Sequence, residues 1–314
     1  MVINRANMDA LFNTYNTAFS AAQQAAAVRA TPNAFMISDV AIMISSTGAA
    51  TVHAWLEQIK AMREWIDERV INNIKLGKLT VINRDFENTV AVDRNDIEDD
   101  QYGQFAPLIG AMGADADGLW DRLGIEALTT NGNWADGNAF FCSDRIIGDS
   151  TITNAVTTAL SLAAVEAGLV AMQSYTLYGG EPADVSSEYL VVGPSLEATA
   201  KAFCEALIVA NTAGTAGISN VSPAMMLKVR VSRRLVGTHA AKWYITGRKG
   251  GIPAIAVQKR KLPTLTRMDK NDDENVFMSK KFLYGTDARG ESFLTMPFLA
   301  YAGGLSSVDA WAAA

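Results

Sequence analysis

Histidine and cysteine are scarce in this sequence, with two residues of each among 314. Cys142 and Cys204 lie far apart, which gives no disulfide framework and is typical of a reducing cytoplasm. His53 and His239 leave little material for a zinc site or for histidine catalysis. We therefore expect no metal, no cofactor and no catalytic residue.

Long apolar runs are also missing. The most apolar segment, residues 159–172, is interrupted by Glu166, which excludes a membrane span. The first residues lack a basic region followed by an apolar run, so we expect no secretory signal. Phosphate-binding glycine motifs do not occur, and Gly193-Pro194-Ser195 lacks the second glycine of a nucleophile elbow. Ser195 is better explained as a helix N-cap.

Charge is unevenly placed along the chain. Residues 1–150 carry 11 basic and 20 acidic groups and residues 151–314 carry 16 and 13, so the halves have net charges of −9 and +3. Seven acids lie within residues 85–100, and eleven basic residues without any acid lie within residues 228–267. Opposite poles favour self-association, because the patch of one copy complements that of another. Two solvated faces are the simpler alternative.

Hydrophobic periodicity predicts helices over residues 8–27 and 102–128, the second with Pro107 in its first turn. A short helix or turn is expected over residues 55–68. Further helices are expected over 155–175 and 195–211, and strands over 189–192, 227–231, 243–246, 254–258, 277–284 and 293–301. This order is not the alternating pattern of a doubly wound nucleotide-binding fold.

Residues 62–95 predict a two-stranded ribbon that reverses near Gly77. Arms of about 17 residues span roughly 55 Å at about 3.3 Å per residue. A globule of this length has a radius of gyration of about 20 Å, so the ribbon must protrude. A protruding ribbon is marginal in water unless something packs on it. We therefore expect a second chain to cover its apolar side chains, which include Ile74, Leu76, Leu79, Val81 and Phe86.

Four blocks of the sequence resemble the major head subunits of Mu-like bacteriophages. They lie within residues 55–100 (including Arg63-Glu64-Trp65 and residues 86–100), 102–107, 189–197 and 274–290. Together they span most of residues 55–301 in the order of the family, and no single block is a common motif. Gly193 stands where the family usually has proline, and Cys142-Ser143 stand where it usually has His-Pro.

The resemblance implies an α+β protein with the HK97-like fold of tailed-phage capsids. In that fold an extended loop lies on a neighbouring subunit, which explains the overlong ribbon. The implied parts are an N-terminal arm (1–54), the extended loop (55–100), a spine helix and peripheral domain (101–150), an axial domain (151–255), and return strands of the peripheral domain with the C-terminus (256–314).

By this resemblance the function is structural, since many copies assemble as hexamers and pentamers into an icosahedral shell around the phage genome. The implied location is the virion, assembled in the host bacterial cytoplasm, and the protein is no enzyme. Scaffold, portal and decoration proteins and non-specifically bound double-stranded DNA are the implied partners, without a membrane. The alternative is a cytoplasmic nucleic-acid-associated binding protein that uses the basic residues 228–267, where Trp243 and Tyr244 are interleaved.

The predicted assembly interface combines the apolar ribbon with both charged poles. The acidic run lacks the glycine and the terminal glutamate of a calcium loop, so we expect it to face a partner or solvent. The predicted interface residues are Trp65, Ile74, Leu76, Leu79, Val81, Phe86, Asp96, Glu98, Asp99, Asp100, Arg233, Arg234, Lys259 and Lys261.

Overall fold

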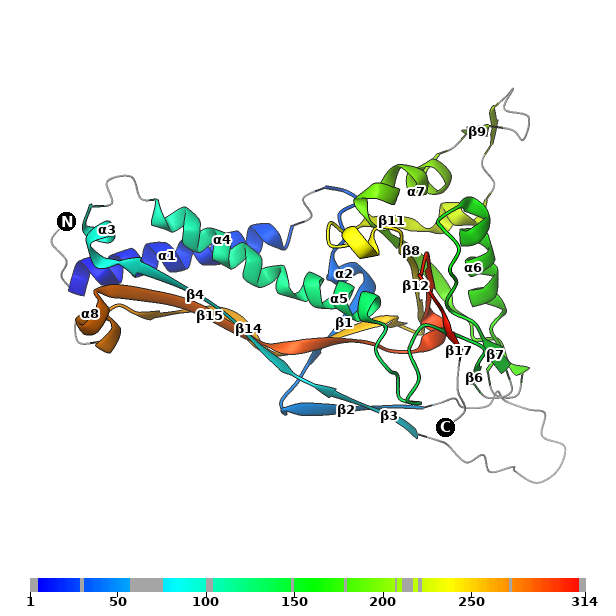
Figure 1. Ribbon diagram of the computed structural model, residues 1–314, viewed down its shortest axis with the longest axis horizontal. Helices are drawn as coiled ribbons and strands as arrows, with labels where there is room; N and C mark the ends of the chain where they lie inside the picture. Colours follow the sequence, from blue (N-terminus) through cyan, green and yellow to red (C-terminus); the bar gives the residue numbers. More distant parts are fainter. Residues whose placement is uncertain are drawn as a thin grey trace.

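The computed structural model describes residues 5–28, 31–56, 76–99, 104–147, 150–177, 180–206, 208–210, 217–219, 222–270 and 273–310. Figure 1 shows an elongated molecule with three parts. A platform of helices over long strands forms one end, a lobe of helices around a sheet forms the other, and a two-stranded ribbon lies below the platform near the lobe.

The helices of the platform run along its length and pack closely on one another. They are α1 (Arg5–Ala26), α4 (Phe105–Asp117) and α5 (Leu119–Thr130). A Cβ atom added to Gly113 of α4 would stand 2.4 Å from the Phe19 carbonyl oxygen of α1. Glycine, which lowers helix propensity, is therefore required for this close approach.

The predicted single helix over residues 102–128 is in fact two consecutive helices, α4 and α5, which meet at Gly118. Gly118 has φ −64° and ψ −8°. Its N–H donates to the Ala114 carbonyl at 3.1 Å, and the Arg122 N–H donates to the Gly118 carbonyl at 3.1 Å. The joint falls at a glycine, a residue of low helix propensity, and Pro107 lies in the first turn of α4, as predicted.

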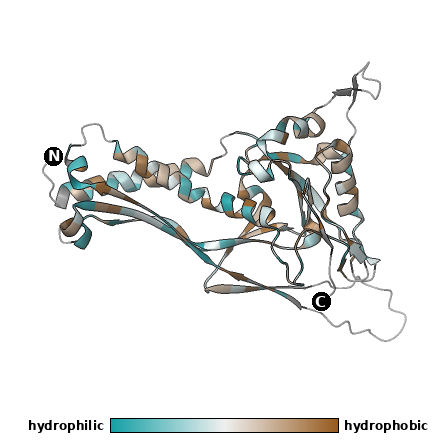
Figure 2. Ribbon diagram, viewed as in Figure 1, coloured by the Kyte–Doolittle hydropathy of each residue, from teal (hydrophilic) through white to brown (hydrophobic). Residues whose placement is uncertain are grey.

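The strands of the platform form a four-stranded sheet in the order β1-β14-β15-β4. They are β1 (Ala41–Ser45), β4 (Arg84–Asp93), β14 (Ile255–Met268) and β15 (Lys281–Leu294). Burial alternates along the whole of β15, and Figure 2 shows polar and apolar segments alternating along these strands. Tyr284 on the buried face meets Tyr15 of α1 edge to face at 5.2 Å. The helices therefore cover one face of the sheet.

The lobe is built around a second sheet, in the order β11-β8-β12-β13, with β16 paired to β12. Leu190 and Val191 on β8 and Trp243 and Ile245 on β12 are fully buried. The continuous apolar runs predicted as strands are therefore strands. The elements of the lobe are β8 (Ser186–Val192), β11 (Lys228–Val231), β12 (Trp243–Lys249), β13 (Ile252–Pro253), β16 (Ala300–Gly303), α6 (Leu162–Ser174) and α7 (Glu197–Cys204).

The ribbon consists of β2 (Ala50–Leu56) and β3 (Leu76–Ile82), paired antiparallel from Ala50↔Ile82 to Leu56↔Leu76. The prediction of a reversal at Gly77 is wrong, because Gly77 lies inside β3 opposite Trp55. Trp55 and Leu56 belong to β2 and not to a helix. The Asn83 N–H donates to the Ala49 carbonyl at 3.0 Å, which fixes the pairing at the base of the ribbon. The rest of the predicted first arm and helix, residues 57–75, lies outside the described residues.

Two predicted helices are shorter than expected. The helix predicted over residues 155–175 begins only at Leu162, because the Val156 N–H donates to the Ala302 carbonyl and Ser161 caps the helix. The helix predicted over 195–211 is a 3₁₀ turn, η2 (Pro194–Leu196), followed by α7, which ends at Cys204. Tertiary pairing overrides local propensity in the first case.

Two predicted strands also differ. Residues 277–279 belong to the helix α8 (Glu274–Ser279), which ends where Lys280 adopts φ 55°, so β15 begins at Lys281. The strand predicted over 293–301 is divided, because the 3₁₀ turn η5 (Pro297–Leu299) separates β15 from β16.

The remaining elements are α2 (Ile37–Val40), α3 (Arg94–Asp99), β5 (Cys142–Ser143), β6 (Arg145–Ile147), β7 (Ser150–Ile152), β9 (Ile208–Ala210), β10 (Gly217–Ser219), η3 (Pro223–Met226), η4 (Gly237–His239) and β17 (Asp309–Ala310).

Candidate assembly surfaces

The ribbon has two different faces. Side chains alternate along its strands, so Val81 and His53 point to one face and Ile82 and Val52 to the other. Val81 is buried, and the His53 ring stacks on Phe293 of β15 at 4.5 Å. Ile82 is 67% exposed and Val52 is 56% exposed. The inner face is therefore covered by the platform, and the outer face is open.

This arrangement corrects one expectation from the sequence. Val81 is buried within its own chain, so the prediction that a second chain must cover it is wrong. Leu79 and Phe86 are half-buried, and the guanidinium groups of Arg84 and Arg122 lie 5.4 and 5.7 Å from the Phe86 ring. The described strands of the ribbon, β2 and β3, lie against the platform. Trp65, Ile74 and the side chain of Leu76 lie outside what the structure describes.

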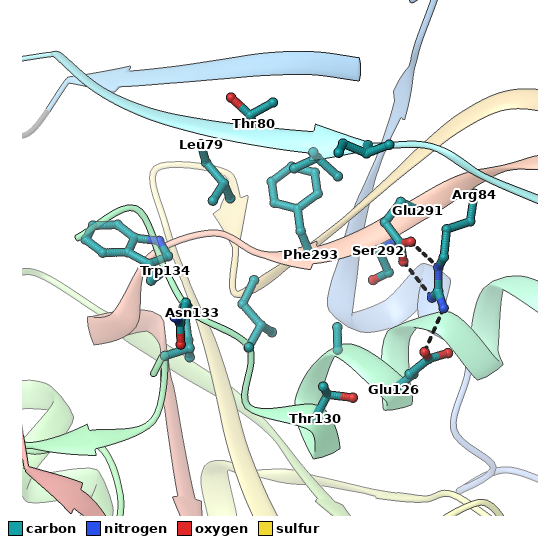
Figure 3. A pocket seen from close by; sticks show the side chains of 16 residues that line it. Leu79, Thr80, Arg84, Glu126, Thr130, Asn133, Trp134, Glu291, Ser292 and Phe293 are labelled. Carbon is teal, nitrogen blue, oxygen red and sulfur yellow. Dashed lines mark hydrogen bonds and ion pairs between the residues drawn. The ribbon is translucent and has the colours of Figure 1, made fainter. Parts of the chain in front are cut away.

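A cavity of about 390 Å³ separates β3 from the end of α5 and from β15 (Figure 3). Its walls are mainly apolar and include Trp134, Phe293 and Leu79. Arg84 lies at one side, where it donates to Glu126 Oε1 at 2.9 Å and to Glu291 (Figure 3). These hydrogen bonds raise the pKa of Arg84 above its ordinary value. The ribbon, the helix α5 and the strand β15 are therefore connected around this cavity by apolar side chains and by the ion pairs of Arg84.

The acidic residues predicted for the interface lie on and directly after α3, at the end of the platform far from the lobe (Figure 1). Asp96 and Asp99 are exposed, while Ile97 is buried in the platform core. Ile97 thus anchors the helix and leaves the two carboxylates in solvent. The side chain of Glu98 and the whole of Asp100 lie outside the described part of the chain.

The basic pole is not one surface. Arg230 pairs with Asp39 at 2.7 Å and Arg267 with Asp9 at 2.6 Å, and Lys261 pairs with Asp287. The basic stretch is divided because β11 lies in the lobe and β14 in the platform, and each strand meets acids from distant segments.

The other three predicted basic interface residues have surroundings different from those of Lys261. Lys259 lies 4.8 Å from the Trp120 ring, and burial lowers its pKa. Arg233 and Arg234 are exposed on the turn after β11. Like Asp96 and Asp99 on α3, these two arginines are exposed.

The described residues offer little for chemistry. The prediction that Ser195 caps a helix is wrong. Its Oγ donates to the Ala240 carbonyl at 3.0 Å, and Gly193 occupies the cap position of η2. Burial raises the pKa of the Cys142 thiol and raises that of Cys204 to about 12. Among the described residues, no three His, Cys, Asp or Glu side chains gather to hold a metal ion. No helix in the same part of the chain is long and apolar enough to cross a membrane.

Sequence reasoning missed a polar cluster at the base of the ribbon. Gln258 is fully buried on β14 and bonds to Asn83 and to His53. The available signal is Gln258 itself, a polar residue that ends the apolar run 254–257 on a strand predicted to be buried. A polar residue in such a position violates the apolar pattern and marks a specific role.

The arrangement of platform, lobe and ribbon is found in solved phage capsids. The chain superimposes on the procapsid protein of bacteriophage JBD30 with a TM-score of 0.55 and 24% identity, over 96% of this chain and 75% of that one. It superimposes on the mature capsid protein of bacteriophage PhiM1 with a TM-score of 0.55 and 10% identity, over 90% of each chain. The fold is therefore the α+β, HK97-like fold of phage capsid proteins, as the resemblance implied.

The family follows from the sequence match. The family described as "Mu-like prophage major head subunit gpT" matches residues 8–159 and 222–307, and the chain belongs to this family. The FluMu major head subunit of Haemophilus influenzae is 26% identical over 281 residues, which cover 88% of this chain and 69% of that protein. The major capsid protein of Escherichia phage Mu is 27% identical over 116 residues, 37% of this chain and 36% of that one. The chain is thus a major head subunit, a structural capsid protein.

Proposed function

We propose that copies of this chain assemble as hexamers and pentamers into a closed icosahedral shell that encloses the phage genome. The observation that supports this most directly is the open outer face of the ribbon, with Ile82 67% and Val52 56% exposed. A two-stranded ribbon needs cover to be stable in water, and large apolar side chains left open on it mark a contact surface. Assembly would take place in the host cytoplasm and yield a virion.

The proposed interface combines the outer face of the ribbon with two groups of exposed charged side chains. Asp96 and Asp99 belong to α3, at the far end of the platform, and Arg233 and Arg234 follow β11 of the lobe (Figure 1). Contacts between unlike ends of identical subunits are heterologous, and such contacts close into rings when the rotation fits. The predicted residues Trp65, Ile74, Leu76, Glu98 and Asp100 stay in the proposed interface on the sequence pattern alone.

We also propose that the parts correspond to those of the capsid fold. The ribbon corresponds to the extended loop, the platform to the spine helix and peripheral domain, and the lobe to the axial domain. The parallel pairing of β1 with β14 supports counting residues 41–45 with the platform although they fall within the predicted N-terminal arm.

The proposed partners follow from containment of a genome. They are a scaffold, a portal, double-stranded DNA held without sequence specificity, and decoration proteins. The capsid of bacteriophage JBD30 is decorated with minor capsid protein trimers, which supports including the last. No observation in the described residues favours the nucleic-acid-binding alternative, since Arg230, Lys261 and Arg267 of its basic stretch pair with acids of the same chain.

Negative-stain microscopy and size exclusion of the purified chain test the proposal. We expect shells, capsomers or tubes far above the mass of the 33.6 kDa chain. A clean monomer over a wide concentration range, at low and at moderate salt, would contradict it. A monomer that binds nucleic acid would instead favour the alternative function.

A charge exchange tests the head-to-tail contact. Reversing Asp96 and Asp99 to lysine should weaken assembly, as should reversing Arg233 and Arg234 to glutamate, and combining all four should restore it. The control Asp115→Lys reverses an exposed charge on α4 outside both groups, and it should not restore assembly when it is combined with the arginine reversal. Failure of the four-fold variant to regain assembly would exclude this pairing.

A further inference from the structure

A cluster of buried polar side chains joins the base of the ribbon to the platform. Gln258 on β14 is fully buried, Asn83 between β3 and β4 is 4% exposed, and Ser46 after β1 is 7% exposed. Burying polar groups costs stability unless each finds a hydrogen-bond partner. Three such residues from three segments therefore indicate a specific arrangement.

Gln258 connects both strands of the ribbon to the platform. Its Nε2 donates to the Val81 carbonyl at 3.2 Å and to Asn83 Oδ1 at 2.8 Å, and its Oε1 lies 2.9 Å from His53 Nε2. A carbonyl oxygen only accepts, so the amide nitrogen must face Val81 and the amide oxygen must face His53. His53 therefore carries a proton on Nε2 and donates it.

Asn83 occupies the point where the chain passes from one sheet to another. The strand before it, β3, pairs with β2, and the strand after it, β4, pairs with β15. Its Nδ2 donates to Ser46 Oγ and to the Gly48 carbonyl, both at 2.9 Å. Ser46 in turn donates from its N–H to the Lys259 carbonyl at 3.0 Å. The junction is therefore held from β1 and β14 together.

We propose that Ser46, His53, Asn83 and Gln258 form an orientation latch that sets the direction in which the ribbon leaves the platform. The apolar contact of Val81 with the platform holds the ribbon close, but apolar burial has no directional preference. Hydrogen bonds have strict geometry, so a satisfied buried network selects one orientation. The latch thereby places the open face with Val52 and Ile82 for the next copy, a role that rests on the proposed assembly function.

A matched pair of variants separates orientation from stability. Gln258→Met removes a fully buried amide that makes three hydrogen bonds. Asn154→Leu removes another fully buried amide with three hydrogen bonds, to the Cys142 N–H and to the Phe140 and Pro297 carbonyls, and none of them reaches the ribbon or β14. Each change replaces an amide by an apolar side chain of similar size, so both should lower the melting temperature comparably.

The direct measurement is a distance between ribbon and platform. Spin labels are placed at Thr80→Cys on the outer face of β3 and at Asn88→Cys on β4, both exposed, while the two native cysteines are buried. In unassembled subunits, Gln258→Met should broaden the distance distribution and Asn154→Leu should not. Gln258→Met should also raise the concentration for half-maximal shell formation about tenfold, which corresponds to about 1.4 kcal/mol.

A distance distribution for Gln258→Met as narrow as that of Asn154→Leu would overturn the latch. If Gln258→Met does not fold, His53→Phe provides the same test, because it keeps a ring against Phe293 and removes only the donor. His53→Gln, which can donate, should then restore the narrow distribution. If the wild-type chain does not assemble, the proposed function fails while the distance measurement still decides on the latch.

Discussion

The lobe and the ribbon bury their strands in different ways. In the lobe, three successive residues of β8 (Leu190, Val191 and Val192) are fully buried, so both faces of the strand are covered within the chain. In the ribbon, Val81 is buried and the next residue, Ile82, is 67% exposed. The strand β8 of the lobe is therefore covered on both faces within the chain, whereas the ribbon has one face that no described residue covers.

The two regions also differ in what specifies their geometry. The lobe is specified by close packing, as where a Cβ atom on Gly303 would stand 2.1 Å from the Trp243 ring. The base of the ribbon is specified by the hydrogen bonds of Asn83 and Gln258 and by the ion pairs of Arg84. A change in the lobe should therefore affect stability, and a change in the ribbon should affect assembly.

The largest expected effect is loss of assembly without loss of the fold. Replacing residues 57–75 by a short Gly-Ser turn that joins Leu56 to Leu76 keeps the paired strands of the ribbon. We expect a soluble, cooperatively melting subunit that forms no closed shells, as checked by calorimetry and negative-stain microscopy. If this variant forms normal shells, or if it fails to fold, the distinction between a ribbon that serves assembly and a lobe that serves stability is wrong. A replacement that also removed Val81 and Asn83 would not be a fair test, because both are buried.

The next effect concerns the lobe alone. Trp243→Ala removes a fully buried ring whose Nε1 donates to the Thr158 carbonyl at 3.1 Å. It should lower the free energy of unfolding by about 3–5 kcal/mol, because it leaves a large cavity. Urea denaturation measures this.

The matched control is Phe277→Ala on α8, where the ring is 82% exposed. It should change the free energy of unfolding by about 0.5 kcal/mol or less. Equal losses from both changes would mean that the lobe does not depend on its buried core in the way described.

A smaller effect is expected at the ribbon junction. Arg84→Ala removes the ion pairs with Glu126 and Glu291, and the Arg84 side chain is 45% exposed. The loss should be about 1 kcal/mol or less and should shrink at high salt, because exposed pairs are screened. Thermal melts at two salt concentrations check this, and the loss from Trp243→Ala should not depend on salt in the same way. A salt-independent loss at Arg84 would show that packing on Phe86 dominates.

The smallest effect is on thiol reactivity and leaves stability unchanged. Burial raises the pKa of Cys204 in the lobe to about 12, so at pH 8 the thiol stays protonated and is a poor nucleophile. A disulfide thiol reagent should therefore label Cys204 slowly until the lobe unfolds, and faster as the pH approaches the raised pKa. Thr80→Cys on the ribbon should be labelled at once. Rapid native labelling of Cys204 would show that α7 opens readily.

Elements with strong local patterns were predictable, and elements fixed by distant partners were not. The apolar run at β8 and the helical spacing of α1 lead to the observed strand and helix, since one continuous or periodic pattern decides each. The reversal at Gly77 is wrong because the partner of β3 is β2, and that register depends on hydrogen bonds of Asn83. The helix over 155–175 begins late because Val156 pairs with Ala302, far along the chain.

In the candidate surfaces, too, local patterns were predictable and contacts between distant segments were not. Linear charge located Asp96, Asp99, Arg233 and Arg234, which are open in the structure. It did not predict that Arg267 pairs with Asp9, because the two are separated by 258 residues and meet only when α1 lies along β14. The latch was missed for the same reason, since its four members come from four separate segments.

The passage of β3 into β4 through Asn83 has a mechanical consequence. A pull on the ribbon acts along the axis of β4, which is paired with β15 over ten residues, from Arg84↔Gly290 to Asp93↔Lys281. The hydrogen bonds of an antiparallel pair lie perpendicular to the strands, so such a load shears them together and does not peel them apart one at a time. A subunit held by its ribbon in a shell under internal pressure would therefore carry the tension along β4 and β15, the direction in which this sheet resists best.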